Sequence, residues 1–323
     1  MQVDRDIFKK NLDSLAEDIA SRTGGFEPRT VLAIVGPTGT GKSYLAERVA
    51  RILEEQDAMP AVEIVSADSM QVYRGMDIGT AKVPAEKRSV PYHCIDLVDP
   101  GEAYSASIYQ RDAREAIEKV FSLGKLPIVC GGTGLYVRAA LDVMDFPPGD
   151  QVENPVRAKY TAIAEEKGPE YVHSLLEQVD PESASLIHPN NVRRTIRAFE
   201  MLSEGRHYSD QVSGMKTFNP FYDTVYIGLT METDTLYASI DNRVDEMMEA
   251  GLLDEVSGLV DRGFADAITS SQAIGYKEFI DVFEGKSTID EAVESIKRST
   301  RRYSKRQRTW FRRDPRIEWY QVD

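Results

Sequence analysis

The residues whose types and spacing could do chemistry begin at position 36, where the chain reads GPTGTGKS. This stretch matches the pattern G-x-x-x-x-G-K-S/T and lies between an apolar run and a segment with helical periodicity, which is the context of a P-loop. Its members are Gly36, Pro37, Thr38, Gly39, Thr40, Gly41, Lys42 and Ser43. Backbone N–H groups would surround phosphate oxygens, Lys42 would neutralise the terminal phosphates and Ser43 would ligate Mg²⁺. The motif predicts a phosphate-binding site but does not identify the compound.

Two polar residues follow other apolar runs of the chain. Asp68 comes just after the run 62–65, and Thr133 stands in GGTG after the run 126–130. Because the carboxyl ends of neighbouring parallel strands meet at the ligand crevice, both side chains should face the P-loop ligand. Asp68 could bind a metal through water, act as a general base, or only cap a helix or form a turn. Thr133 could equally be the N-cap of a helix that starts at Leu135.

The elements that must position these residues alternate between strands and helices. Apolar runs predict strands at 31–35, 62–65, 126–130 and 225–229, and periodicity predicts helices at 42–55 and 105–123. This alternation is typical of an α/β fold with a parallel sheet. Residues from 234 onward are expected to be mostly helical.

A change of pattern near residue 142 predicts a second part of the chain. Residues 146–151 (FPPGDQ) are interpreted as a linker, and residues 152 to about 207 show helical patterns without a convincing strand. We therefore expect a helical insertion over 142–216 within an α/β core made of 30–141 and 217–323. Residues 1–29 are interpreted as an N-terminal helix plus linker, to which no role is assigned.

The charge of the chain is unevenly distributed. The formal net charge is -14, yet residues 297–316 contain ten Lys or Arg and a single Asp. A basic segment on an acidic chain can attract phosphates to one place, although it could also be a solvated helix face. Its aromatic residues Tyr303, Trp310 and Phe311 could stack on bases or form the buried stripe of an amphipathic helix.

Composition excludes several classes of protein. Two cysteines, Cys94 and Cys130, are too few for a disulfide framework, and the four histidines form no cluster typical of zinc sites. No run of about 18 apolar residues is present, which argues against a membrane-spanning helix. The N-terminal residues are too acidic for a signal or transit peptide. These features favour a cytoplasmic protein with reduced thiols and no structural metal.

Several motifs in their order resemble those of tRNA dimethylallyltransferases, also called tRNA isopentenyltransferases. They are GPTGTGKS (36–43), SADSMQVYRGMDIGTAK (66–82), HCIDLVDPGEAYSASIY (93–109), PIVCGGTGLYV (127–137), HPNNVRRTIRAFE (188–200), QAIGYKE (272–278) and KRQRTWFRR (305–313). The resemblance covers about residues 30–320. The P-loop alone is shared with many unrelated proteins, whereas DSMQVYRGMDIGTAK together with GGTGLY is specific to this family and its near relatives.

The resemblance implies a reaction and its partners. Dimethylallyl diphosphate would donate its prenyl group to the exocyclic amine of the adenine just 3′ of the anticodon of a tRNA, with Mg²⁺ as cofactor. Asp68 would be the general base, Lys42 would stabilise the departing diphosphate, and Thr133 would assist at the reacting diphosphate oxygen. Neither a membrane nor an obligate protein partner is implied, and the family resemblance favours a monomer.

The resemblance also implies a set of tRNA-binding positions. Those around the flipped-out adenine are Asp68, Ser69, Met70, Gln71, Thr133, Gln272, Gly275, Tyr276 and Lys277. Those on the anticodon stem and along the basic segment are Arg157, Val192, Arg193, Arg194, Thr195, Ile196, Lys305, Arg306, Gln307, Arg308, Trp310 and Arg312. The helical insertion would then bind the anticodon stem while the α/β core performs the chemistry.

Three alternatives remain open from the sequence. An adenylate isopentenyltransferase shares the core but uses a free nucleotide, and it has less need of the insertion and the basic segment. A P-loop kinase for small molecules would turn over ATP and would leave the basic segment unexplained. A regulatory ATP-binding or RNA-binding module would not need a carboxylate such as Asp68 near the phosphates.

Overall fold

The computed structural model describes residues 5–56, 61–146, 154–262, 264, 267 and 269–323. It divides into two compact units, one formed by Met1–Met144 with Pro220–Asp323 and the other by Asp145–Asn219. The predicted linker at 146–151 lies outside the described residues except for Phe146. No helix among the described residues is long and apolar enough to cross a bilayer.

The first unit contains a six-stranded parallel sheet with the strand order β3-β2-β4-β1-β5-β6. Its strands are β1 (Val31–Val35), β2 (Val62–Ser66), β3 (Tyr92–His93), β4 (Leu126–Gly131), β5 (Thr224–Thr230) and β6 (Ile317–Gln321). The predicted α/β fold with a parallel sheet is confirmed. The short strand β3 and the strand β6 were not predicted. The region from residue 234 onward is mostly helical, as expected, and β6 follows its last helix.

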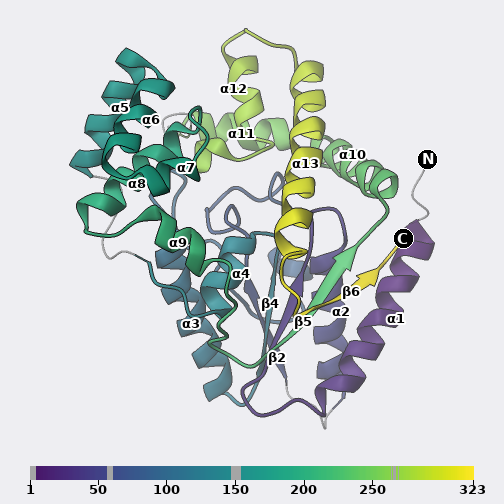
Figure 1. The fold of residues 1–323 in the computed structure, drawn as a ribbon. Helices are drawn as coiled ribbons and strands as arrows, with labels where there is room; N and C mark the ends of the chain where they lie inside the picture. The colour runs from purple at the N-terminus through teal and green to yellow at the C-terminus, as the bar shows by residue number, and fades with distance from the viewer. Residues whose placement is uncertain (1–4, 57–60, 147–153, 263, 265–266, 268) are drawn as a thin grey trace. The chain divides into compact units, whose positions relative to one another are not determined.

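Central strands are buried on both faces because helices cover the sheet on each side. All residues of β1, β2 and β4 are buried. Helix α2 (Lys42–Glu55) connects β1 to β2, and α3 (Ala106–Ser122) precedes β4, so the two connections run in opposite directions along the sheet. Right-handed crossovers therefore place α2 and α3 on opposite faces, as Figure 1 shows. Both helices match the predicted ranges closely.

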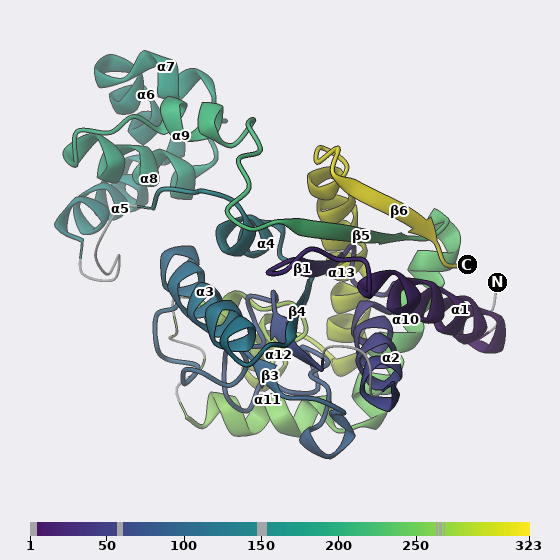
Figure 2. The same ribbon diagram turned by 90° about the horizontal axis from the view of Figure 1, so that it is seen from below.

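The N-terminal segment belongs to the core of this unit. Helix α1 (Arg5–Thr23) runs beside α2 (Figure 2) and buries Leu12, Ala16 and Ile19 in the same apolar cluster as β1 and α2. The segment that the sequence left without a role is therefore part of the packed α/β unit.

The remaining helices of the first unit follow the strands β4 and β5. They are α4 (Gly134–Leu141), α10 (Thr233–Glu249), α11 (Leu252–Val260), α12 (Lys277–Phe283) and α13 (Ile289–Phe311), with short 3₁₀ turns at Ala85–Lys87 and Ser270–Gln272. Thr288 and Glu291 form a reciprocal capping box that starts α13. This helix then runs back towards the sheet and leads into β6 (Figure 1).

The second unit is helical throughout the residues that are described. It consists of α5 (Pro155–Lys167), α6 (Pro169–Val179), α7 (Pro181–Ser185), α8 (Val192–Ser203) and α9 (Tyr208–Gly214). Asn154, Asp180 and Asn191 cap α5, α7 and α8 with their side-chain oxygens, which satisfies backbone donors at the helix starts. An apolar cluster around Val172, Leu176 and Phe199 forms its core.

Candidate active site

The P-loop connects β1 to α2 and ends at Gly41, which has a left-handed backbone with φ of 79°. Helix α2 begins at the next residue, Lys42, so backbone N–H groups at the start of the helix face the loop. The Lys42 side chain is half-buried, and its ammonium donates to the carbonyl oxygen of Pro37 at 2.7 Å. Burial lowers the pKa of Lys42 to about 8. The loop thus has the backbone and the cation that a phosphate group requires.

A cavity of about 480 Å³ lies over this loop. Predicted residues that line it are Thr38, Gly39, Gly41, Lys42, Ser43, Asp68, Gln71 and Gln307. The structure therefore brings the P-loop and the carboxylate after β2 to one space, as parallel strand ends should. Cys130 also lines the cavity, but burial raises the pKa of its thiol to about 12, so it is not a nucleophile at neutral pH.

Asp68 and Thr133 lie at the ends of neighbouring strands. Asp68 Oδ1 accepts a hydrogen bond from the backbone N–H of Met70 at 2.9 Å, so the carboxylate both forms a turn and lines the cavity. Thr133 Oγ1 accepts from the backbone N–H of Ser69 at 3.1 Å. Thr133 is the N-cap residue of α4, as the sequence predicted, and its carbonyl oxygen accepts from the backbone N–H of Tyr136 at 2.8 Å. Its hydroxyl makes no capping bond to the helix, so the predicted role of the hydroxyl as the cap is wrong. Its hydroxyl instead joins the end of β4 to the turn after β2.

Gln307 has a structural role that the sequence did not predict. It is buried, its Oε1 accepts from the Thr38 backbone N–H at 2.9 Å, and its Nε2 donates to the Gly132 carbonyl oxygen at 2.9 Å. This side chain therefore bridges the P-loop to the GGTG turn, and its contact with tRNA stays a prediction. The nearby Tyr303 also lines the cavity, and burial raises its pKa to about 12.

Arg243 of α10 is a site residue that the sequence analysis missed. Its guanidinium donates to Thr38 Oγ1 at 2.9 Å and lines the cavity with Lys42. Burial lowers its pKa, and the Asp68 carboxylate acts in the opposite direction. No local motif surrounds this arginine, since it stands in an ordinary acidic helix. A second cation therefore faces the P-loop from a distant part of the chain.

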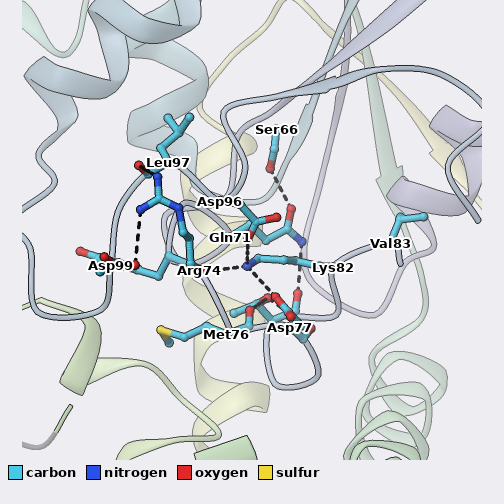
Figure 3. A network of polar contacts seen from close by, with 12 residues as sticks. Ser66, Gln71, Arg74, Met76, Asp77, Lys82, Val83, Asp96, Leu97 and Asp99 are labelled. Atoms are coloured by element: carbon cyan, nitrogen blue, oxygen red, sulfur yellow. Dashed lines mark hydrogen bonds and ion pairs between the residues drawn. The ribbon is translucent and has the colours of Figure 1, made fainter. Parts of the chain in front are cut away.

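Buried polar contacts hold the segment 68–82 that carries Asp68 and Gln71 (Figure 3). The Lys82 ammonium donates to the Tyr73 carbonyl oxygen at 2.5 Å, to Asp77 Oδ1 at 2.7 Å and to Asp96 Oδ1 at 2.5 Å. Its side chain is only 2% exposed. Gln71 accepts from the Ser66 hydroxyl at 2.8 Å. This network fixes the backbone from which the two cavity residues project.

A second support for this segment comes from Glu255 and Tyr276. The Glu255 carboxylate accepts from the backbone N–H groups of Ile78 at 2.8 Å and Gly79 at 3.3 Å, and from the Tyr276 hydroxyl at 2.6 Å. A Cβ atom at Gly79 would lie 2.4 Å from the Tyr276 ring, so only glycine fits there. Tyr276 is fully buried. Tyr276 therefore supports this segment, and its contact with adenine stays a prediction. Gly275 is buried as well, whereas Gln272 and Lys277 are exposed.

Comparison with known proteins agrees with this geometry. A family model described as IPP transferase matches residues 71–314. The tRNA dimethylallyltransferase of Carboxydothermus hydrogenoformans is 47% identical over 293 residues, which cover 90% of this chain and 91% of the relative. The chain belongs to the tRNA dimethylallyltransferase family. The family member from Bacillus subtilis is 44% identical, with 90% of each chain covered.

Solved structures of the family show the same fold. The tRNA isopentenylpyrophosphate transferase of Bacillus halodurans has a TM-score of 0.64 and 43% identity, covering 91% of this chain and 90% of its own. A eukaryotic dimethylallyltransferase acting on tRNA has a TM-score of 0.73 and 29% identity, covering 91% of this chain and 74% of its own.

The family-derived positions in the helical unit differ in their availability. Arg193 and Arg194 of α8 are exposed and Val192 is half-buried, whereas Thr195 and Ile196 are buried. The side chains of these last two residues do not reach the surface, and their contact with tRNA stays a prediction. Arg157 donates to both carboxylate oxygens of the buried Glu200, at 2.6 and 3.2 Å, so its guanidinium also stabilises the unit.

The basic residues of α13 and the turn after it fall into two groups. Lys297, Arg301 and Arg316 form ion pairs with Asp245, Asp241 and Asp142, and Arg308 donates to Thr233 Oγ1 at 3.0 Å. Trp310 packs against Gly134. The others are exposed and form no ion pair among the described residues, and we call them the basic stripe: Arg298, Arg302, Lys305, Arg306, Arg312 and Arg313. The Arg306 guanidinium lies 5.6 Å from the ring centre of Tyr303.

Proposed function

We propose that this protein transfers the dimethylallyl group of dimethylallyl diphosphate to the N6 amine of the adenine 3′-adjacent to the anticodon of tRNA, and releases diphosphate. The single observation that carries the proposal is the cavity that Lys42, Arg243 and Asp68 line together. Two cations suit a diphosphate leaving group, and a carboxylate suits an amine that must lose a proton. The names of the relatives favour tRNA as acceptor over a free nucleotide or a kinase substrate.

In this proposal the N6 nitrogen attacks the allylic carbon while the bond from that carbon to the diphosphate oxygen breaks. Asp68 accepts the proton that the amine loses, and Lys42 and Arg243 stabilise the negative charge that develops on the diphosphate. Thr133, tied to the turn after Asp68, assists at the reacting diphosphate oxygen. The adenine must leave its stack to reach the cavity.

Ser43 is the residue proposed to hold Mg²⁺. Its hydroxyl lines the cavity beside Lys42, and a hydroxyl oxygen combined with diphosphate oxygens and water is a ligand set that Mg²⁺ prefers. The described residues contain no cluster of three or more His, Cys, Asp or Glu that could hold a metal without the diphosphate. When bound, the ion would neutralise part of the diphosphate charge.

Mass spectrometry of nucleosides tests the proposal directly. Unmodified tRNA is incubated with the protein, Mg²⁺ and dimethylallyl diphosphate, then digested, with AMP as the alternative acceptor and ATP as the alternative donor. The expected product is adenosine that carries one added isopentenyl group, from tRNA only. Prenylation of AMP in preference to tRNA, or ATP consumption without prenyl transfer, would overturn the proposal.

A further inference from the structure

One wall of the cavity comes from helix α1, outside the region that resembles the family motifs. Phe8, Lys9 and Leu12 line the same space as Lys42 and Asp68. These three residues occupy neighbouring positions on one side of the helix, as a spacing of three or four residues requires. The N-terminal helix therefore reaches the proposed donor site itself.

Helix α1 is held firmly in this position. Asp13 Oδ1 accepts from the Tyr44 hydroxyl at 2.9 Å and from Arg48 Nε at 2.7 Å, both on α2. Arg22 donates to Glu318 Oε2 at 2.9 Å and to the Tyr320 hydroxyl at 2.8 Å, both on β6. Contacts at the middle and at the C-terminal end, together with a buried apolar face, make the helix a fixed part of the unit.

The P-loop packs closely against this helix at Gly41. A Cβ atom at Gly41 would lie 2.6 Å from Leu12 Cδ1 and 2.9 Å from Phe8 Cζ. Both distances are too short for a real Cβ atom, and Gly41 also has a positive φ, so a side chain here would displace either the loop or α1. The close fit fixes Lys9 next to the start of α2.

The charges around the cavity leave a role for Lys9. The charged side chains that line it are Lys9, Lys42, Arg243, Asp68 and Glu246. The charges of Lys42 and Arg243 balance those of Asp68 and Glu246, so Lys9 gives the lining of the cavity its net positive charge. Within the described part of the chain Lys9 forms no ion pair, and its side chain is exposed at the edge of the cavity. An approaching diphosphate would meet this ammonium together with the half-buried cations of Lys42 and Arg243.

We infer that Lys9 is a donor-binding residue whose ammonium binds the diphosphate, and that α1 completes the donor site. This inference rests on the proposed function for the identity of the donor, because the diphosphate is its leaving group. Being exposed, Lys9 contributes mainly to capture of the donor, so it should affect binding of the diphosphate more than the chemical step.

The chain offers a matched control at the next position. Lys10 is also exposed, is also without an ion pair in the described residues, and does not line the cavity. Lys9→Glu, Lys9→Arg and Lys10→Glu are compared with the unaltered protein by calorimetric titration with inorganic diphosphate in Mg²⁺ buffer. Steady-state kinetics with dimethylallyl diphosphate and tRNA follow. Thermal melting establishes that each variant is folded.

We expect Lys9→Glu to raise the Kd for diphosphate and the KM for the donor about tenfold at low salt, with kcat and the KM for tRNA little changed. Lys9→Arg should restore binding, Lys10→Glu should behave like the unaltered protein, and the difference should shrink as salt rises. Equal diphosphate Kd values for Lys9→Glu and Lys10→Glu would overturn the inference even if the protein prenylates tRNA. Weaker diphosphate binding by Lys9→Glu alone would support it even if prenyl transfer were absent and the proposed function were wrong.

Discussion

The buried face and the exposed face of α13 have different roles, although residues of the two faces are adjacent in the sequence. Gln307 is buried and bonded to the P-loop, whereas its neighbour Arg306 is exposed in the basic stripe. A helix turns by about 100° per residue, so adjacent positions can serve unrelated tasks. The inner face shapes the donor cavity and the outer face presents positive charge. Residues of one apparent sequence motif therefore divide between support of the site and an exposed basic surface.

The largest effect on kcat is expected from a substitution of Asp68, which lines the cavity. Asp68→Asn keeps an oxygen for the hydrogen bond from Met70 but removes the base, so kcat should fall by about 10² to 10⁴ while donor and tRNA binding change little. The fall in the rate of the chemical step is measured by single-turnover prenyl transfer with both substrates at saturating concentration. Turnover near that of the unaltered protein would remove Asp68 from the mechanism.

A direct test of the two faces replaces adjacent residues of α13. Gln307→Ala leaves the Thr38 N–H and the Gly132 carbonyl oxygen without their partner, so kcat/KM for the donor should fall about 10- to 100-fold. Arg306→Ala should leave kcat/KM for the donor unchanged. Equal donor kinetics for the two variants would contradict the division of the helix. Equilibrium binding of tRNA should be unaffected by Gln307→Ala.

The kcat/KM for the donor should also depend on pH, because Lys42 loses its charge at high pH. Burial lowers the pKa of Lys42 to about 8, so the ammonium loses its proton as pH rises through that value. The free enzyme then loses a cation for the diphosphate, and kcat/KM for the donor should be about tenfold lower at about pH 9 than on the plateau below pH 7. Lys42→Arg, whose side chain stays charged, should abolish this fall. A flat profile for the unaltered protein would mean that the Lys42 charge does not limit donor capture.

The smallest effect is expected from a single residue of the basic stripe. Arg306→Glu should raise the KM for tRNA about fivefold at moderate salt and make its salt dependence less steep, since one phosphate contact is lost. Lys10→Glu makes the same charge change elsewhere in this unit and is the control. A change in donor KM, with tRNA KM unaffected, would show that the outer face does not bind RNA.

Local signals explain which parts of the fold could be predicted. β1 and α2 were predicted at their observed limits because an apolar run, a P-loop and a helical pattern follow each other directly. β6 was missed because its residues IEWYQ include two exposed positions and follow a basic helix. Its pairing with β5 depends on Tyr226 and Ile317, which are far apart in the chain.

The site was predictable only where it depends on short motifs. Ser43, Lys42 and Asp68 follow strands in recognisable contexts, and the structure brings them to one cavity. Arg243 and Lys9 stand in helices without a motif, and only tertiary packing brings them there. The structural role of Gln307 was not predicted for the same reason, because periodicity alone does not tell which face of a basic helix meets the sheet.

The hydrogen bond between Thr38 and Gln307 joins positions that are 269 residues apart, and this separation has a consequence for folding. During synthesis the P-loop leaves the ribosome long before its partner on α13. The helices α5 to α9 have local contacts and can fold early, whereas the sheet must wait for β5 and β6. This contact can therefore close only after α13 has been synthesised, and a nascent chain that stops short of α13 would hold a P-loop without the Gln307 bond.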